Sequence, residues 1–174
     1  MKLRAYQNEA VSAAYDALSL KKNPVLQLAT GTGKSLIIAE LAKLYKAEGK
    51  RVWILTHVQQ LVNAATYLKY TGERAGVVCA GLNRKDTNEP IIFGTIQSMN
   101  GVLSEMEDPD LIIIDEAHRV PHNYGEPTLY ENILRRFSSA LRVAMTATPW
   151  RMDNGIIYGN GEEFFFDTLA YNYT

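Results

Sequence analysis

Cysteine, histidine and long apolar runs are scarce in this sequence, and each scarcity excludes a class of protein. Cys79 is the single cysteine among 174 residues, so a disulfide framework and a cysteine-built zinc site are both excluded. The 3 histidines are His57, His118 and His122, of which only the last two have the i, i+4 spacing of a helical zinc pair, and we expect no zinc site. No apolar run approaches the roughly 18 residues that span a bilayer, and the N-terminus lacks the apolar stretch of a signal peptide. We therefore expect a soluble, cytoplasmic protein without a membrane partner.

The sequence also lacks an excess of positive or of negative charge. The chain has 18 Lys+Arg against 19 Asp+Glu, a net charge of −1, so it lacks the basic footprint of a stand-alone nucleic-acid-binding protein. The basic doublets at 21–22, 84–85 and 135–136 are scattered, which favours solvated surface over a phosphate track. Apolar residues make up 47% of the chain, which excludes intrinsic disorder and, at this length, is typical of one globular domain.

Aromatic residues are concentrated at the C-terminal end. Residues 155–174 hold 6 of the 17 aromatic side chains, namely Tyr158, Phe164, Phe165, Phe166, Tyr171 and Tyr173. A free tail would leave these apolar rings in water. The pattern therefore indicates either that the tail folds back on the domain or that a partner segment covers it.

Short apolar runs alternate with longer segments of helical period. The patterns predict helices at 4–19, 34–47, 58–70, 96–103 and 127–137, and strands at 25–28, 52–55, 76–79, 91–94, 111–114 and 141–145, with a polar turn at 81–90. The run Leu111–Ile114 is typical of a strand buried in the middle of a parallel sheet. The alternation predicts an α/β domain with a mostly parallel sheet and helices on both faces, and ligands outside the carboxyl ends of its strands.

A glycine-containing loop follows the first predicted strand and opens a helix. It consists of Ala29, Thr30, Gly31, Thr32, Gly33, Lys34 and Ser35. Such a loop can turn several N–H groups toward an anion, with Lys34 reaching the β- and γ-phosphates and the Ser35 hydroxyl binding Mg²⁺. The strict P-loop pattern has a glycine where this chain has Leu28, so a chance glycine turn stays open from this segment alone.

Two adjacent carboxylates end the 111–114 strand. Placing Asp115 and Glu116 there is costly unless a cation or a bound water uses them. Asp115 would hold Mg²⁺ through water, and Glu116 would polarise the water that attacks the γ-phosphate. The alternative is a solvated turn with an acidic helix start.

Two weaker signals flank these motifs. Hydroxyl groups of Thr146 and Thr148 end another strand and could bond to His118 or Glu116, although a plain Thr-Pro turn explains them nearly as well. Near the N-terminus, Gln7 could bond both edges of adenine and Arg4 could stack on its face, although both fit an ordinary helix surface.

Together these motifs resemble, in order, the Q motif and motifs I, II and III of superfamily 2 DEAD/DEAH-box helicases. Thr56, His57 and Gln60 fall where motif Ia lies, and 94–98 resembles motif Ib/Ic. Within the superfamily the stretches 37–42, 80–85 and 147–152 look most like RadD-like DNA-repair helicases, with a related resemblance to the motor parts of type I and III restriction enzymes.

The resemblance implies an ATP- and Mg²⁺-dependent motor made of two RecA-like domains. This chain would be the first domain, over residues 1–152, with 153–174 as the lead-in to a missing second domain that supplies an arginine. The isolated chain would then be a nearly inactive monomer. The resemblance also implies weak contacts with nucleic acid, DNA favoured over RNA, around Thr56, His57, Gln60, Thr95 and Gln97. A restriction-enzyme motor and a non-catalytic nucleotide- or partner-binding module remain as alternatives.

Overall fold

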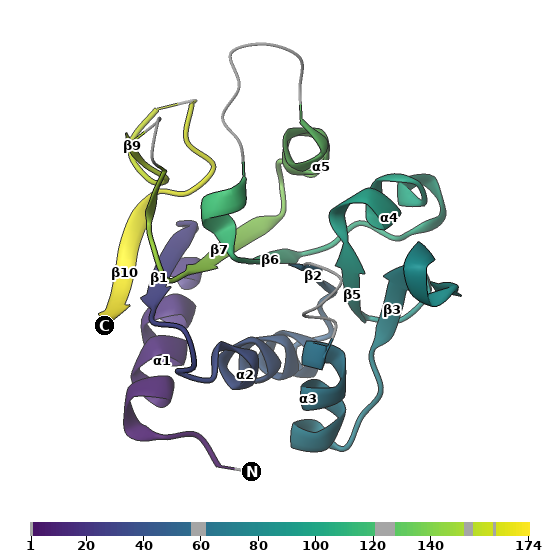
Figure 1. Ribbon diagram of the computed structural model, residues 1–174, viewed down its shortest axis with the longest axis horizontal. Coiled ribbons are helices and arrows are strands. Elements are labelled where there is room, and N and C mark those ends of the chain that lie inside the picture. The colour runs from purple at the N-terminus through teal and green to yellow at the C-terminus, as the bar shows by residue number, and fades with distance from the viewer. Residues whose placement is uncertain (1, 57–61, 121–127, 152–154, 162) are drawn as a thin grey trace.

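The computed structural model describes residues 2–56, 62–120, 128–151, 155–161 and 163–174, and in these ranges it is a three-layer α/β domain (Figure 1). The helices are α1 (Ala5–Ser19), α2 (Lys34–Ala47), α3 (Val62–Thr71), α4 (Ile96–Asn100) and α5 (Leu129–Arg136). The strands are β1 (Pro24–Leu28), β2 (Val52–Thr56), β3 (Gly76–Cys79), β4 (Arg84–Lys85), β5 (Ile91–Thr95), β6 (Leu111–Asp115), β7 (Leu141–Thr146), β8 (Trp150–Arg151), β9 (Gly155–Ile156) and β10 (Thr168–Tyr173). None of the described helices is long and apolar enough to cross a membrane.

Eight strands form the central sheet in the order β10-β1-β7-β6-β2-β5-β3-β4, and the short β8 and β9 form a separate antiparallel pair. Every pairing in the large sheet is parallel except that of β3 with β4. The carboxyl ends of parallel strands lie at one edge, so the segments after β1, β6 and β7 are neighbours although they are far apart in sequence. The predicted parallel α/β fold is confirmed.

The core has two parts, one on each face of the sheet. Helices α1, α2 and α3 cover one face, and α4 and α5 cover the other (Figure 1). The five residues of β6 are all buried, because helices shield both faces and leave no solvated side for polar residues. On the second face, the Trp53 ring packs edge-on against Phe137 with 4.9 Å between the ring centroids.

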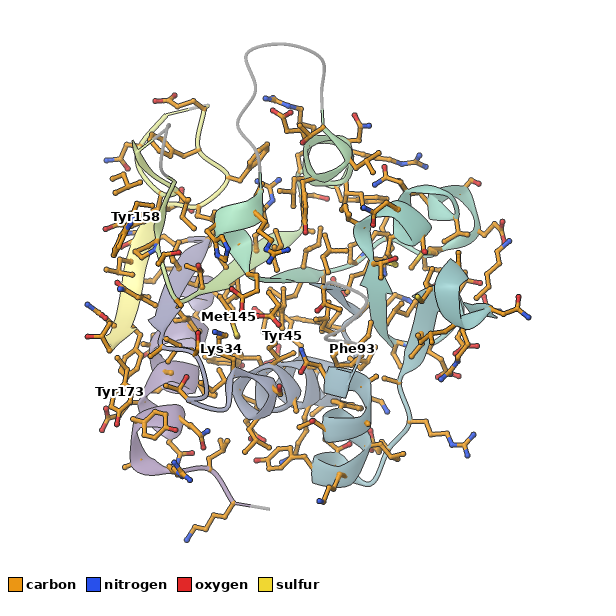
Figure 2. The ribbon with its side chains drawn as sticks, viewed as in Figure 1. Lys34, Tyr45, Phe93, Met145, Tyr158 and Tyr173 are labelled. Carbon is orange, nitrogen blue, oxygen red and sulfur yellow. The ribbon has the colours of Figure 1, made fainter. Side chains whose placement is uncertain are left out.

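The aromatic C-terminal segment folds back on the domain, as one of the two sequence interpretations has it. Its last strand, β10, pairs parallel with β1 and extends the sheet by one strand. Tyr171 packs against the core under α1, whereas Phe165 and Phe166 are buried in the core on the opposite face. The Tyr173 ring stacks on Tyr6 of α1, with 4.2 Å between centroids and 8° between planes. Figure 2 shows Tyr173 at the outer edge of the sheet, beside α1.

The structure differs locally from the predicted elements at three places. The polar turn at 81–90 contains β4, which pairs with β3. The helix expected over 96–103 ends at Asn100 and is followed by a short 3-10 turn at Leu103–Glu105. Helix α5 begins at Leu129, because the Thr128 hydroxyl accepts a hydrogen bond from the Glu131 N–H as an N-cap.

Candidate functional site

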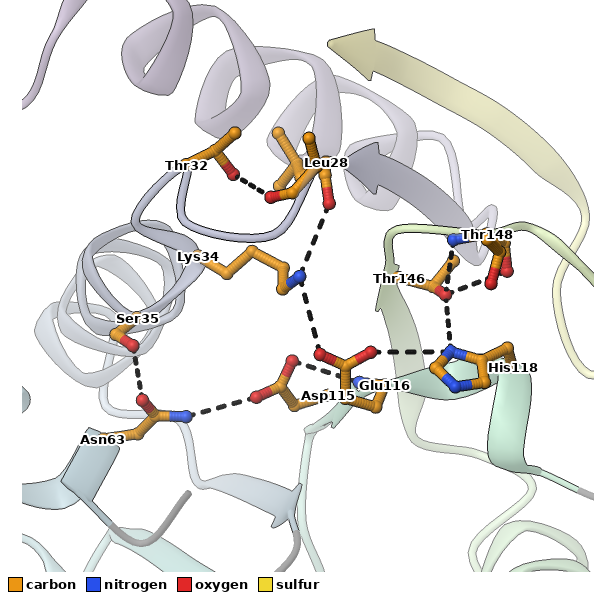
Figure 3. A network of polar contacts seen from close by, with 11 residues as sticks. Leu28, Thr32, Lys34, Ser35, Asn63, Asp115, Glu116, His118, Thr146 and Thr148 are labelled. Carbon is orange, nitrogen blue, oxygen red and sulfur yellow. Dashed lines mark hydrogen bonds and ion pairs between the residues drawn. The ribbon is translucent and has the colours of Figure 1, made fainter. Parts of the chain in front are cut away.

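The loop between β1 and α2 has the backbone shape of an anion-binding turn. Gly31 and Gly33 have φ angles of +83° and +76°, which side-chain-bearing residues rarely adopt. The Thr32 hydroxyl donates to the Ala29 carbonyl across 2.7 Å and closes the turn. Leu28 stands where the strict P-loop pattern has a glycine, and its main-chain carbonyl accepts a hydrogen bond from Lys34 Nζ at 3.4 Å (Figure 3). Because this contact uses the main chain, a leucine side chain at this position does not alter it.

Lys34 and Glu116 approach each other from different strand ends. Lys34 Nζ lies 3.5 Å from Glu116 Oε1, and their side chains are only 11% and 17% exposed (Figure 3). Glu116 has a φ of +54°, in the left-handed region that costs a non-glycine residue roughly 1–2 kcal/mol. Backbone strain of this kind is concentrated at functional sites, where the surrounding structure holds it in place.

Asp115 is the most buried acid of the site, with 3% of its surface exposed. Burial raises the pKa of its carboxyl above the usual range, and the neighbouring Glu116 charge raises it further. The Lys34 charge and a hydrogen bond from the Glu116 N–H to Asp115 Oδ1, at 3.0 Å, oppose the rise. A cation beside this carboxylate would relieve the cost of burying its charge.

A residue that sequence reasoning missed lies between the two predicted metal ligands. Asn63, in the first turn of α3, accepts a hydrogen bond from the Ser35 hydroxyl and donates one from Nδ2 to Asp115 Oδ2 at 3.2 Å. Its surface is 6% exposed. No local sequence pattern marks a single asparagine in a predicted helix as a partner of metal ligands. The one feature of the sequence that could have pointed to Asn63 is that it is a polar residue on a helix face that is otherwise buried.

The predicted coupling residues come together behind Glu116. His118 Nδ1 lies 3.5 Å from Glu116 Oε2 and 3.0 Å from the Thr146 hydroxyl. That hydroxyl donates to the Thr148 carbonyl at 2.9 Å and accepts from the Thr148 N–H at 3.1 Å. Burial lowers the pKa of His118, with the Glu116 carboxylate acting against it. The chain of contacts joins the end of β6 to the end of β7 (Figure 3).

The N-terminal residues contact the glycine loop. The Gln7 amide is 3% exposed; its Oε1 accepts from the Arg4 N–H at 2.9 Å and its Nε2 donates to the Thr32 carbonyl at 3.0 Å. The Tyr6 hydroxyl donates to the same carbonyl at 2.7 Å. Arg4 is exposed at the rim of a cavity of about 250 Å³ that these residues share with Gly31, Thr32 and Gly33.

The residues predicted to contact nucleic acid are placed differently from one another. Thr56 and Thr95 are paired on neighbouring strands β2 and β5 and are 1% and 3% exposed. Gln97, in the first turn of α4, is exposed. His57 and Gln60 lie outside the described residues. Of the described members of this set, Gln97 therefore presents its side chain to solvent most openly.

Known proteins resemble this chain in sequence or in fold. A 51.5 kDa protein of a Lactococcus phage is 32% identical over 148 residues, which cover 84% of this chain and 27% of the phage protein. In structure, the chain resembles a nuclease-deletion mutant of the Type ISP restriction-modification enzyme LlaGI in complex with a DNA substrate mimic, with a TM-score of 0.72 and 18% identity over 98% of this chain and 20% of that one. It also resembles the Hef helicase domain of Pyrococcus furiosus, with a TM-score of 0.71 and 22% identity over 98% of this chain and 38% of that one.

The chain thus spans well under half of each relative, and the likeness in structure shows a shared fold. A sequence model of one family matches residues 1–151, which include the glycine loop, the two adjacent carboxylates and the Thr146–Thr148 turn. The chain belongs to the family described as "Type III restriction enzyme, res subunit".

Proposed function

We propose that this chain is the ATP-binding motor domain of a superfamily 2 DNA helicase or translocase, which couples ATP hydrolysis to movement on nucleic acid. The observation that carries the proposal is the convergence of Lys34, Ser35, Asp115 and Glu116 at one edge of the sheet. A phosphate-binding loop, oxygen ligands for a cation and a carboxylate beside them are the parts that phosphoryl transfer to water requires.

The protein groups divide the chemistry between them. The loop at 29–33 and the N-terminus of α2 bind the phosphates, and Lys34 supplies a positive charge at the β- and γ-phosphates. Glu116 orients the attacking water and polarises it. The contacts from Glu116 through His118 to Thr146 connect this carboxylate to β7. A shift of β7 would therefore change the position of the group that orients the water.

Ser35 and Asp115 fit Mg²⁺. Both offer oxygen, the ligand type that Mg²⁺ prefers, and Asp115 is a buried carboxylate whose charge needs compensation. Within the described residues no three His, Cys, Asp or Glu side chains cluster as a metal cage, which suits an ion that takes one or two protein ligands with phosphates and waters. When bound, Mg²⁺ would neutralise phosphate charge.

Nucleic acid would lie across the same edge of the sheet, near Gln97 and the ends of β2 and β5. The near-zero net charge favours contacts through polar side chains and main chain, which position a strand without reading its sequence. The DNA complex of LlaGI supports DNA as the partner. The resemblance to superfamily 2 helicases implies that an arginine of a second RecA-like domain completes the site, and we propose that this arginine lies outside these 174 residues.

The second candidate is the motor part of a restriction enzyme, which the family description and LlaGI both favour. The two candidates share the ATP site and differ in the rest of the protein. A nuclease domain in the same reading frame would select the restriction enzyme.

Nucleotide binding and hydrolysis by the purified chain test the proposal. ATP should bind, and turnover should be very slow with or without DNA, because an arginine finger alone is worth roughly 10³–10⁵ in rate. Adding the remainder of the protein as a separate chain should raise the turnover, and Glu116→Gln should abolish that gain while ATP binding persists. A gain that Glu116→Gln leaves intact would contradict the role of this carboxylate, and no gain at all would favour a non-catalytic module.

A further inference from the structure

Asn63 connects two helices and a strand at the point where the metal would bind. It lies on α3, whereas its partners Ser35 and Asp115 lie on α2 and at the end of β6 (Figure 3). Its amide is buried and bonds to both partners, so neither its rotamer nor the direction of its two polar atoms is free. Its two hydrogen bonds join the two expected metal ligands.

The polarity of the two hydrogen bonds matches what a metal site needs. A serine hydroxyl that binds a cation must present an oxygen lone pair to it and give its proton to another acceptor. Asn63 Oδ1 is that acceptor for Ser35. Asp115 Oδ2 accepts from Asn63 Nδ2 while Asp115 Oδ1 accepts from a main-chain N–H, which fixes the carboxylate plane.

We infer that Asn63 is a positioning residue of the Mg²⁺ site: it takes the proton of the Ser35 hydroxyl and orients the Asp115 carboxylate, so that both oxygens face one cation. The inference rests on the proposed ATP-binding function. Residues that orient metal ligands by hydrogen bonds change metal affinity about 10–100-fold when they are replaced. Asparagine suits this place because one side chain supplies an acceptor and a donor; leucine has a comparable size and supplies neither.

The test separates metal binding from nucleotide binding and from folding. Calorimetry would measure the Kd of ADP with saturating Mg²⁺ and with EDTA, for the wild-type chain and for Asn63→Ala and Asn63→Leu. Asn63→Leu fills the volume that alanine would leave open, so it serves if the alanine variant does not fold. Asn100→Ala is the matched control, because Asn100 also bonds from a helix to two partners, the Ile96 and Leu129 carbonyls, but lies on α4.

We expect the gain in ADP affinity on adding Mg²⁺ to fall about 10–100-fold in both Asn63 variants, with affinity in EDTA unchanged within about twofold. Asn100→Ala should keep the wild-type gain. A folded Asn63 variant with a wild-type gain would overturn the inference, and so would an equal loss with and without Mg²⁺, which would mean that Asn63 only supports the fold of the loop. If the wild-type chain itself bound no ADP, the proposed function would fail, and this inference with it.

Discussion

Replacing Gly33 with alanine would test how the glycine loop is held by α1. Gly33 has a φ of +76°, and a Cβ placed there would lie 2.7 Å from Gln7 Nε2. Gly31 is the matched control, because its φ of +83° is as unfavourable for alanine while no heavy atom beyond its two chain neighbours lies within 4 Å of the point that an alanine Cβ would occupy. Both substitutions therefore carry the backbone cost, and only one carries the collision.

The magnitudes follow from the contacts. The left-handed backbone costs alanine roughly 1–2 kcal/mol at either site. At Gly33 the Gln7 amide must also move, and because it is buried and bonded to the Arg4 N–H and the Thr32 carbonyl, each broken hydrogen bond adds about 1 kcal/mol. At about 2–4 °C of Tm per kcal/mol for a chain of this size, Gly31→Ala should lower Tm by roughly 2–8 °C and Gly33→Ala by roughly 5–15 °C.

A double-mutant cycle with Gln7→Ala isolates the collision. Gln7→Ala with Gly33→Ala should destabilise the chain by about 1–2 kcal/mol less than the sum of the single changes, because removing the amide makes room for the Cβ. Gln7→Ala with Gly31→Ala should be additive within about 0.5 kcal/mol. Urea unfolding measures both cycles. Additivity in the Gly33 cycle would refute the argument that Gln7 supports the loop.

Three further outcomes are expected from single changes. Lys34→Ala should weaken ATP binding roughly 100-fold, because it removes the charge that reaches the phosphates; an unaltered affinity in calorimetry would contradict the phosphate-loop assignment. Burial depresses the pKa of His118 below its unfolded value of about 6.5, so the stability this residue contributes is present above that pH and is lost as the pH falls through the folded value. The Tm of His118→Gln should therefore fall less than that of wild type from about pH 7.5 to about pH 5, and equal slopes would refute this. Tyr173→Ala should lower Tm by roughly 2–6 °C through loss of the stack on Tyr6, and Tyr173→Phe should restore it.

The sequence predicts the fold well where the information is local. The buried run at 111–114 and the helical periods flanking it can be read without knowing the partners, because a strand covered on both faces has no polar side. The glycine loop and the two adjacent carboxylates are readable for a similar reason, since each motif is contiguous and its chemistry needs few residues. Parallel topology then places their ends together.

Asn63 and β10 could not be predicted in the same way. The role of Asn63 depends on partners 28 and 52 residues away, and its own neighbours in sequence say nothing about them. The C-terminal aromatic residues signal burial but not the register of a strand, which is set by pairing with β1 more than 140 residues earlier. In both cases the information lies in a long-range contact that one sequence does not show.

The glycine loop is held from the outside by segments at both ends of the chain. The Thr32 carbonyl accepts from Tyr6 and Gln7 of α1, and the Ala29 N–H donates to the Tyr173 carbonyl of β10 at 3.1 Å. Because the Thr32 carbonyl oxygen points to α1 and accepts from it, this oxygen is turned away from the place proposed for the phosphates, where the loop would present N–H donors. The stack of Tyr173 on Tyr6 then ties the two supports together, so the shape of the loop depends on β10 as well as on its own glycines. Tyr173, one of the aromatic residues concentrated at the C-terminal end, therefore belongs to the framework of the proposed nucleotide site.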